Sequence, residues 1–259
     1  MMKSQRSYSE SPTSILKLSR SKLDLFVRCP RCFYLDIRLN IKQPPGFPFS
    51  LNNAVDHLLK KEFDQYRKQG VPHPYMKQLD VEAVPFVHDK LDFWRDPLRG
   101  GISKIHQESR IELYGGVDDL WITREGALII VDYKATSKEK EVTLDEPWQD
   151  GYRRQADVYA WLFHQNGFSV YPKAYFVYCN GLMNQERFDN QLVFDVKVLS
   201  YELNLDWIEE TLNEARSCLE NNYVPTLTSG CDFCKYTEKL KEKHIFETSF
   251  PQMTFDFKG

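Results

Sequence analysis

The chain has 259 residues, of which 42% are hydrophobic and 27% charged, and its formal net charge is −3. That length suffices for one well-buried α/β domain, which we expect over residues 15–259. No apolar run approaches the roughly 20 residues that cross a bilayer. Residues 1–14 are polar and lack an apolar signal core, which predicts a disordered tail and a cytoplasmic protein. The net charge does not itself indicate nucleic-acid binding, although basic residues gather in residues 1–42.

The first third of the chain reads mainly as helix. Ser19 or Ser21 can cap a helix that runs toward Cys29, and the Pro-rich residues 43–49 form a loop. A second helix begins at Ser50 or Asn52 and continues to about residue 70. Its apolar residues recur at helical spacing and predict one core-facing stripe, formed by Leu51, Val55, Leu58, Leu59 and Phe63. Residues 71–101 predict helix and loop.

The second half of the chain alternates helices and strands, which favours an α/β fold. A long helix is expected over residues 148–165 and strands over residues 173–179 and 187–198. An amphipathic helix follows over about residues 203–219. No Gly-rich phosphate loop with Lys-Ser or Lys-Thr is present, so the sequence predicts no ATPase motor.

The central residues 111–134 read as a β-hairpin turning at Arg124-Glu125-Gly126. If the turn is centred on Glu125, residues whose numbers sum to 250 oppose each other, and Asp118 faces Asp132. Opposed residues have Cβ atoms roughly 5 Å apart, where like charges are destabilising. Hard divalent cations such as Mg²⁺ or Mn²⁺ prefer such oxygen ligands. Lys134 shares the strand face of Asp132, so the hairpin predicts a metal-dependent site that cleaves phosphodiesters.

The alternative to this site is a solvated strand end, which is what an isolated Asp-x-Lys usually marks. Two features favour the metal site. Asp132 ends an apolar run, and Gly115-Gly116 before Asp118 suits a bulge or a close backbone approach. The prediction depends on register, because a slip of one residue would put the carboxylates on opposite faces. Asp119 is expected to point to the other face.

Four cysteines form a second constellation. Cys29-x-x-Cys32 and Cys231-x-x-Cys234 are two CxxC pairs about 200 residues apart. Paired CxxC elements offer four thiolates to Zn²⁺ or to an iron–sulfur cluster. The interval between the pairs is longer than in a zinc ribbon, so spacing alone does not choose the metal. Unpaired thiols are the alternative.

The ordered motifs of the chain resemble the PD-(D/E)XK nuclease superfamily, and in particular its RecB-type and Cas4-like exonucleases. The motifs are Leu18–Leu23, Cys29–Tyr34, Asn53–His57, Gly116–Asp118, Val131–Lys134 and Gln155-x-x-x-Tyr159. The resemblance implies a restriction-endonuclease-like mixed central sheet flanked by helices. It also implies that the N- and C-terminal segments, about residues 18–42 and 221–245, join at a cysteine-bound metal centre.

The resemblance also implies site roles. His57, Asp118, Asp132 and the Tyr133 carbonyl would hold Mg²⁺ or Mn²⁺, and Lys134 would position the attacking water or stabilise the transition state. Gln155 and Tyr159, four residues apart on one helix face, would line the DNA channel. The family usually has glycine where this chain has Asn53.

The cysteines depart from the Cas4-like pattern, which ties one N-terminal and three C-terminal cysteines to a [4Fe–4S] cluster. This chain lacks a third C-terminal cysteine, and Leu240 stands at about its place. Cys32 can complete a two-plus-two set, so Zn²⁺ and [4Fe–4S] both stay open.

The expected function is a metal-dependent DNA nuclease, an exonuclease acting on single-stranded DNA or duplex ends in recombination or repair. One alternative is a CRISPR-adaptation nuclease that trims DNA, and another is a non-catalytic nucleic-acid-binding protein on the same fold. The expected partners are DNA and either a helicase or a CRISPR integrase, with no membrane.

Overall fold

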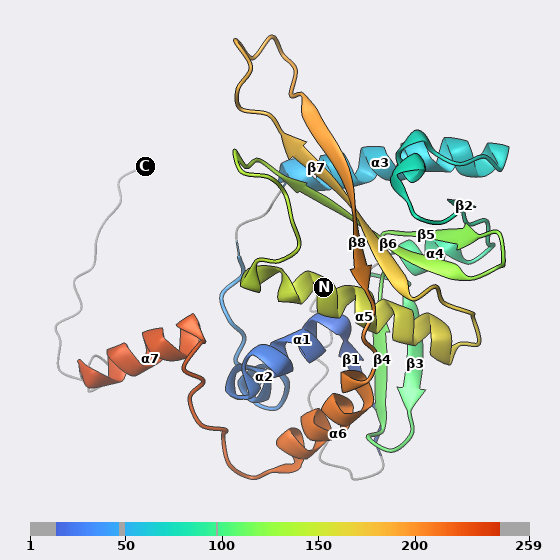
Figure 1. The fold of residues 1–259 in the computed structure, drawn as a ribbon. Coiled ribbons are helices and arrows are strands. Elements are labelled where there is room, and N and C mark those ends of the chain that lie inside the picture. Colours follow the sequence, from blue (N-terminus) through green and yellow to red (C-terminus); the bar gives the residue numbers. More distant parts are fainter. Residues whose placement is uncertain (1–13, 47–49, 97, 244–259) are drawn as a thin grey trace.

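A computed structural model describes residues 14–46, 50–96 and 98–243. These residues form a mixed α/β fold with two β-sheets and helices packed against them (Figure 1). The helices are α1 (Arg20–Arg28), α2 (Pro30–Ile37), α3 (Ser50–Gln69), α4 (Leu91–Arg95), α5 (Asp150–Gln165), α6 (Trp207–Glu220) and α7 (Asp232–Glu242), with 3₁₀ turns η1 (Pro74–Gln78) and η2 (Pro147–Gln149). The strands are β1 (Leu16–Ser19), β2 (Ala83–Pro85), β3 (Ile102–His106), β4 (Ile111–Gly115), β5 (Asp119–Thr123), β6 (Leu128–Thr136), β7 (Lys173–Gly181) and β8 (Phe194–Glu202).

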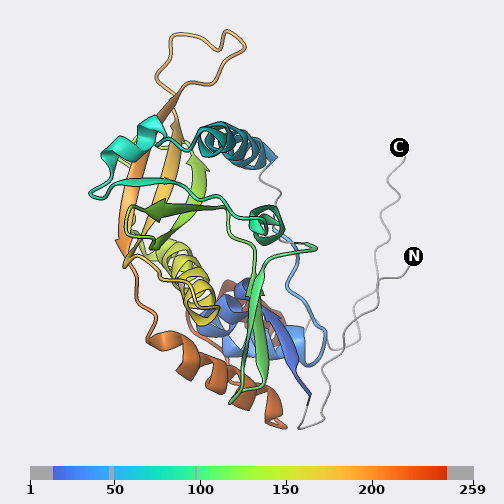
Figure 2. The ribbon, with the colours of Figure 1, turned by 90° about the vertical axis from the view of Figure 1, so that its right-hand side faces the viewer.

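The larger sheet has the order β2-β5-β6-β7-β8, with β6 and β7 parallel and the other neighbours antiparallel. Both of its faces are covered, which explains the continuous apolar run of β6. On β6, Ile129 and Val131 pack in the core that includes Leu59 and Phe63 of α3, whereas Ile130 packs in the core that includes α5. Figure 2 shows α3 and α5 on opposite sides of this sheet. Because side chains alternate along a strand, Asp132 and Lys134 lie on the α5 face.

The smaller sheet has the order β1-β4-β3, in which β1 runs parallel to β4 and β3 antiparallel to it. Because β1 pairs with β4 as far as Ser19↔Tyr114, helix α1, which begins at Arg20, starts next to the end of β4. The loop between β7 and β8 extends away from the rest of the molecule in both views (Figures 1 and 2).

The hairpin register predicted around Glu125 is confirmed, but the length of its first arm was wrong. β5 pairs with β6 through Asp119↔Val131 and Trp121↔Ile129, the expected sum of 250. Residues 111–123 are not one strand, however. The chain breaks after Gly115, and β4 joins the other sheet by pairing with β1 and β3. Local pattern could not show this exchange, because it depends on partners distant in sequence.

Three other local predictions were wrong. Leu51 and Leu58 of α3 are exposed, because the buried face of the helix follows Leu59, Phe63 and Arg67. The strand expected over residues 187–198 lies at 194–202, and β7 continues through Asn180 and Gly181, beyond its expected end at residue 179. The short strands β2 and β3 had not been expected.

The predicted tail, residues 1–14, lies almost entirely outside the described residues, which begin at Ser14. Among the described helices, none is both long and apolar enough to cross a bilayer.

Candidate active site and cysteine metal centre

Asp118 and Asp132 are brought together as the hairpin register requires. Asp118 directly precedes β5, and its Oδ2 accepts a hydrogen bond from Tyr133 N at 3.1 Å, next to Asp132 on β6. Asp132 is 2% exposed. Its Oδ1 accepts a hydrogen bond from Gln155 Nε2 at 2.8 Å, and its Oδ2 is ion-paired with Lys134 Nζ. That Oδ2 is buried and accepts no hydrogen bond of regular geometry.

The charge of Asp132 is only partly compensated. Burial raises the pKa of the Asp132 carboxyl to about 7, and the neighbouring Asp118 adds to that effect. Lys134 and Arg20 act in the opposite direction. Burial alone would lower the pKa of Lys134, but the two aspartates outweigh it and raise the pKa above its usual value, so the ammonium stays charged. A buried carboxyl with surplus negative potential is a site that favours a bound cation.

Helix α5 supplies the groups that cover this site. Gln155 Nε2 donates to Asp132 at 2.8 Å and lies 3.5 Å from the Tyr159 hydroxyl, so both residues lie beside the candidate site. Their expected place along a DNA channel stays a prediction. The Tyr159 ring lies against Gly115, where a Cβ atom would stand only 2.7 Å from Tyr159 Cε1. This close approach explains the glycine before Asp118.

Helix α3 reaches the same site, but with residues other than the expected histidine. The face bearing Asn52, Asp56 and Lys60 points to the site: Asn52 Nδ2 donates to Ala135 O at 3.0 Å, and Lys60 Nζ lies 2.9 Å from Asp56 Oδ2 and 3.4 Å from Asp118 Oδ1. His57 is exposed on an adjacent face. Within the described chain, no grouping of three His, Cys, Asp or Glu ligand atoms includes His57. Its predicted role as a ligand stays a prediction.

Sequence reasoning missed Lys60, Asp56 and Arg20 as site residues. The spacing of Asn52, Asp56 and Lys60, four residues each, was the available signal, because such residues share one helix face. Arg20 begins α1, and its Cβ lies 3.3 Å from where a Gly115 Cβ would stand. Among the described residues Arg20 makes no ion pair, whereas Arg153 and Arg154 of α5 are bound to Asp150 and Asp24. Only the fold brings Arg20 to the site.

The second strand residue, Asp119, has a different role. It is fully buried on the α3 face, where its Oδ1 is ion-paired with Arg67 and with Arg95 Nη2, the latter at 2.5 Å. The Tyr133 hydroxyl donates to its Oδ2 at 2.6 Å. This network confirms that Asp118 and Asp119 point to different surroundings.

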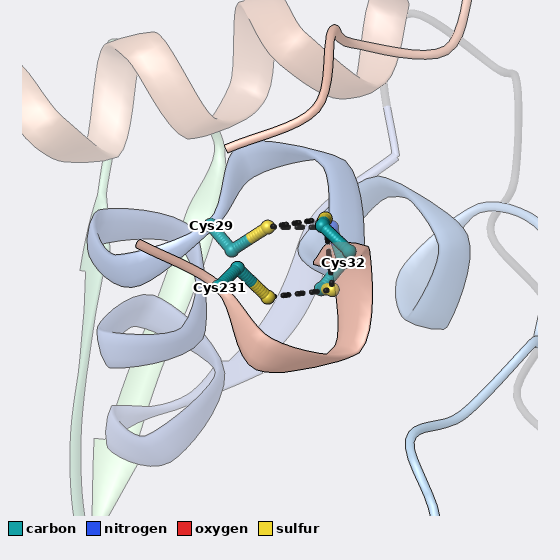
Figure 3. Close-up of side chains that lie close together, drawn as sticks. Cys29, Cys32 and Cys231 are labelled. Atoms are coloured by element: carbon teal, nitrogen blue, oxygen red, sulfur yellow. Dashed lines mark hydrogen bonds between the residues drawn. The ribbon is translucent and has the colours of Figure 1, made fainter. Parts of the chain in front are cut away.

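The four cysteines converge at the starts of two helices. Cys29 precedes α2 and Cys231 precedes α7, and each CxxC pair spans the first turn of its helix. The sulfur atoms all lie within 4.8 Å of one another: Cys29–Cys234 and Cys32–Cys231 are 3.6 Å apart and Cys32–Cys234 4.0 Å. Figure 3 shows the Cys29, Cys32 and Cys231 side chains facing one another. The predicted joining of the N- and C-terminal segments is therefore confirmed.

The thiols of this cluster compete for protons. Burial raises the pKa of Cys29, but hydrogen bonds from Thr228, from Cys32 N and from neighbouring thiols outweigh it and bring the value to about 7. Burial raises the pKa of Cys32, and its thiol neighbours raise it further. Four sulfurs this close cannot all be thiolates without a cation, and a helix N-terminus favours thiolates. The cluster fits a bound metal.

Comparison with known proteins decides the family. The family model of the PD-(D/E)XK nuclease superfamily matches residues 49–238, which include both aspartates, Lys134 and the α5 motif. The chain belongs to this superfamily. The expected fold class is thereby confirmed, and the fold is that of a nuclease.

The other comparisons add little to the superfamily match. A solved structure titled "Crystal structure of SSO0001" is similar at 15% identity, with 86% of this chain and 84% of that one covered and a TM-score of 0.36. No curated protein matches the chain.

Proposed function

We propose that the chain is a metal-dependent DNA nuclease, acting as an exonuclease on single-stranded DNA or duplex ends. The observation that carries the proposal is the convergence of Asp118 and Asp132 across one hairpin, with Lys134 paired to Asp132. A solvated strand end would not bury Asp132 to 2% exposure or cover it with Gln155.

The donor set fits a hard divalent cation. Asp118 and Asp132 would hold Mg²⁺ or Mn²⁺, with the Tyr133 carbonyl as a further oxygen. The Oδ2 of Asp132, which has Lys134 Nζ beside it and no hydrogen bond of regular geometry, would bind the ion. When bound, such an ion lowers the pKa of a water and offsets charge developing on the phosphate.

The surrounding residues supply positive charge and orientation. Lys134 holds its ammonium beside Asp132 and would stabilise a phosphate oxygen or the attacking water. Arg20 would contact the phosphate, because it is the arginine beside the site that makes no ion pair in the described part of the chain. Gln155 would fix the orientation of Asp132.

The resemblance also assigns His57 to the cation, whereas Asp56 is the α3 residue that points toward Asp118 through Lys60. Comparing His57→Ala with Asp56→Ala separates the two assignments. The ligand is the residue whose loss raises the Mn²⁺ concentration needed for half-maximal cleavage.

At the cysteines we propose a single Zn²⁺ ion. A tetrahedral ion with Zn–S bonds of about 2.3 Å places sulfurs about 3.8 Å apart. Three sulfur pairs here are 3.6–4.0 Å apart, and all four sulfurs lie within 4.8 Å of one another. A [4Fe–4S] cubane binds each cysteine at a different iron, which would spread the sulfurs farther. Elemental analysis should give one zinc per chain. The absorption spectrum of the purified protein should lack the broad band at about 400 nm that an iron–sulfur cluster produces. Iron with inorganic sulfide would support the cluster instead, and iron without sulfide would indicate a single iron.

The nuclease proposal is tested by degradation of end-labelled single-stranded DNA with Mn²⁺. The native chain should cleave, and Asp132→Ala and Lys134→Ala should each lower the rate by orders of magnitude. Glu125→Ala is the matched control, because Glu125 is an exposed carboxylate at the opposite end of the same hairpin. If the native chain cleaves neither single strands nor duplex ends, the non-catalytic binding protein is the better proposal.

The same chemistry serves recombination, repair and CRISPR adaptation. A helicase or an integrase therefore remains a proposed partner, and the labelled end in the cleavage assay gives the polarity that each pathway requires.

A further inference from the structure

A cavity of about 450 Å³ opens beside Lys134. It lies between the start of α3, the end of β6, η2 with the start of α5, the end of β7 and the start of β8. Its walls are largely aromatic and aliphatic. They include Trp148, Tyr152, Tyr178, Leu51, Leu192 and Phe194. The volume is that of a site for one small organic group.

The cavity shares a wall with the candidate active site. The Lys134 ammonium lies 4.4 Å from the centre of the Tyr152 ring, and the Tyr152 ring meets Trp148 edge-on with centroids 5.6 Å apart. Since Lys134 is paired with Asp132, a group in the cavity would lie directly next to the phosphate bound at the two aspartates.

Trp148 is unusual among the tryptophans of the chain. It is 53% exposed, whereas Trp94, Trp121 and Trp161 are buried. Lys138 Nζ lies 4.5 Å from the centre of its ring and makes no ion pair within the described ranges. The main chain of Lys138 is fixed, because Asn180 accepts from Lys138 N at 2.8 Å and donates to Lys138 O at 3.0 Å. An exposed indole that lines the cavity thus has beside it an ammonium whose main chain is anchored by Asn180.

We propose that this cavity binds one unpaired nucleobase of a single-stranded substrate, the base next to the scissile phosphate. Trp148 supplies the stacking face, Tyr152 the inner wall, and Lys138 an ammonium for the adjoining phosphate. Stacking on aromatic rings tolerates any base, because every base has a π-face. A base inside a duplex cannot enter such a cavity without leaving its stack, so the cavity selects single strands or frayed ends. This inference rests on the proposed nuclease function and adds to it a binding site for one base, which would explain a preference for unpaired strands.

Binding can be measured without cleavage in the full chain carrying Asp132→Ala. Titration with oligothymidylate should quench tryptophan fluorescence, because Trp148 is the most exposed indole, and a blunt duplex of equal length should not. Adding Trp148→Ala should weaken binding of a labelled oligothymidylate roughly tenfold or more, and Trp148→Phe should restore most of it. Tyr223→Ala is the control for loss of an exposed ring, since Tyr223 is 68% exposed at a distant surface.

The proposal fails if Trp148→Ala binds oligothymidylate as tightly as its parent, or if the duplex quenches and competes equally well. It also fails if neither nucleic acid binds. Failure of the nuclease function is read separately, from cleavage by the otherwise native chain against Asp132→Ala. If the chain cleaves DNA but binds it equally well without Trp148, only the base site is overturned. If binding depends on Trp148 but the chain does not cleave, only the nuclease proposal is overturned.

Discussion

Asp118 and Asp119 are adjacent in sequence, yet their carboxylates meet different surroundings. Asp119 is fully buried and bound by two arginines, the Tyr133 hydroxyl and Leu120 N at 2.7 Å. Asp118 is partly exposed and shares a site with Asp132, whose charge is only partly compensated. A fully paired buried charge maintains the fold, whereas charges left in surplus are what a cation-binding site requires.

The largest effect on stability should come from a change at Asp119, the aspartate whose charge is fully paired. Asp119→Asn removes the charge shared by Arg67 and Arg95, which are both 8% exposed. Both arginines would keep only their half-buried second partner, Asp64, so the loss of the fully buried carboxylate should lower the free energy of unfolding by about 3 kcal/mol, measured by urea denaturation. Glu125→Gln should change it by less than about 0.5 kcal/mol. A loss below about 1 kcal/mol for Asp119→Asn would show that the pairing with Asp64 alone is enough for both arginines.

Asp118→Asn should reduce the cleavage rate strongly and the stability only slightly. Its cleavage rate should fall roughly 10²–10³-fold, because one ligand of the proposed cation is lost. The free energy of unfolding should change by at most about 1 kcal/mol, since the Asp118–Lys60 pair is partly solvated. Single-turnover cleavage and urea denaturation of the same preparation test both statements. Equal activity in variant and native chain would remove Asp118 from the site.

Asp157 of α5 is a third buried carboxyl, away from the proposed cation. Its ionisation should make the stability of the fold depend on pH. Burial raises its pKa to about 6, although Asn204 N, Trp207 and Tyr201 donate hydrogen bonds to it. Between about pH 4 and 6 the folded chain therefore binds more protons at Asp157 than the unfolded chain, so stability falls as pH rises through that window.

The contribution of Asp157 is isolated by subtraction. The difference in unfolding free energy between the native chain and Asp157→Asn should decline with pH by up to about 3 kcal/mol across that window and then level off. A difference that does not change with pH would contradict the raised pKa. Thermal or urea unfolding at several pH values supplies the measurement.

Gln155→Ala should have the smallest effect, because Gln155 acts through Asp132. Losing the 2.8 Å hydrogen bond should raise the Mn²⁺ concentration for half-maximal cleavage about tenfold, as supporting residues of metal sites typically do. Gln155→Glu, which lacks the donor when ionised, should not restore it. A slower rate with unchanged Mn²⁺ dependence would place Gln155 on the substrate instead.

The sequence was sufficient where interactions are local or periodic. The turn at Gly126 and the alternation along β6 predicted that Asp118 opposes Asp132, and the helical spacing predicted that Gln155 and Tyr159 share a face. The two CxxC pairs predicted that the four cysteines cluster, because four thiolates can share one metal centre.

The rest depended on packing between distant segments. The departure of β4 from the hairpin follows from its pairing with β1, about 95 residues earlier in the chain, and from the ring of Tyr159 that covers Gly115. Asn52, Asp56 and Lys60 face the site because of the rotation of α3, which Phe63 and Leu59 set against the sheet. The expected role of His57 as a ligand stays a prediction. The predicted apolar stripe included Leu58, which is exposed, and therefore implied a different rotation of α3 about its axis.

The cysteine cluster has a consequence for synthesis. Cys32 and Cys231 are 199 residues apart, so the first pair of thiols emerges long before its partners. At about 5–20 residues per second, the ribosome needs roughly 10–40 seconds to make the intervening chain. Strands β4 to β8 can pair during that interval, whereas the four-sulfur cluster can form only when α7 has left the exit tunnel. Capture of the proposed metal would therefore follow the pairing of the strands, and a pulse of newly made chains should resist chelator only after that delay.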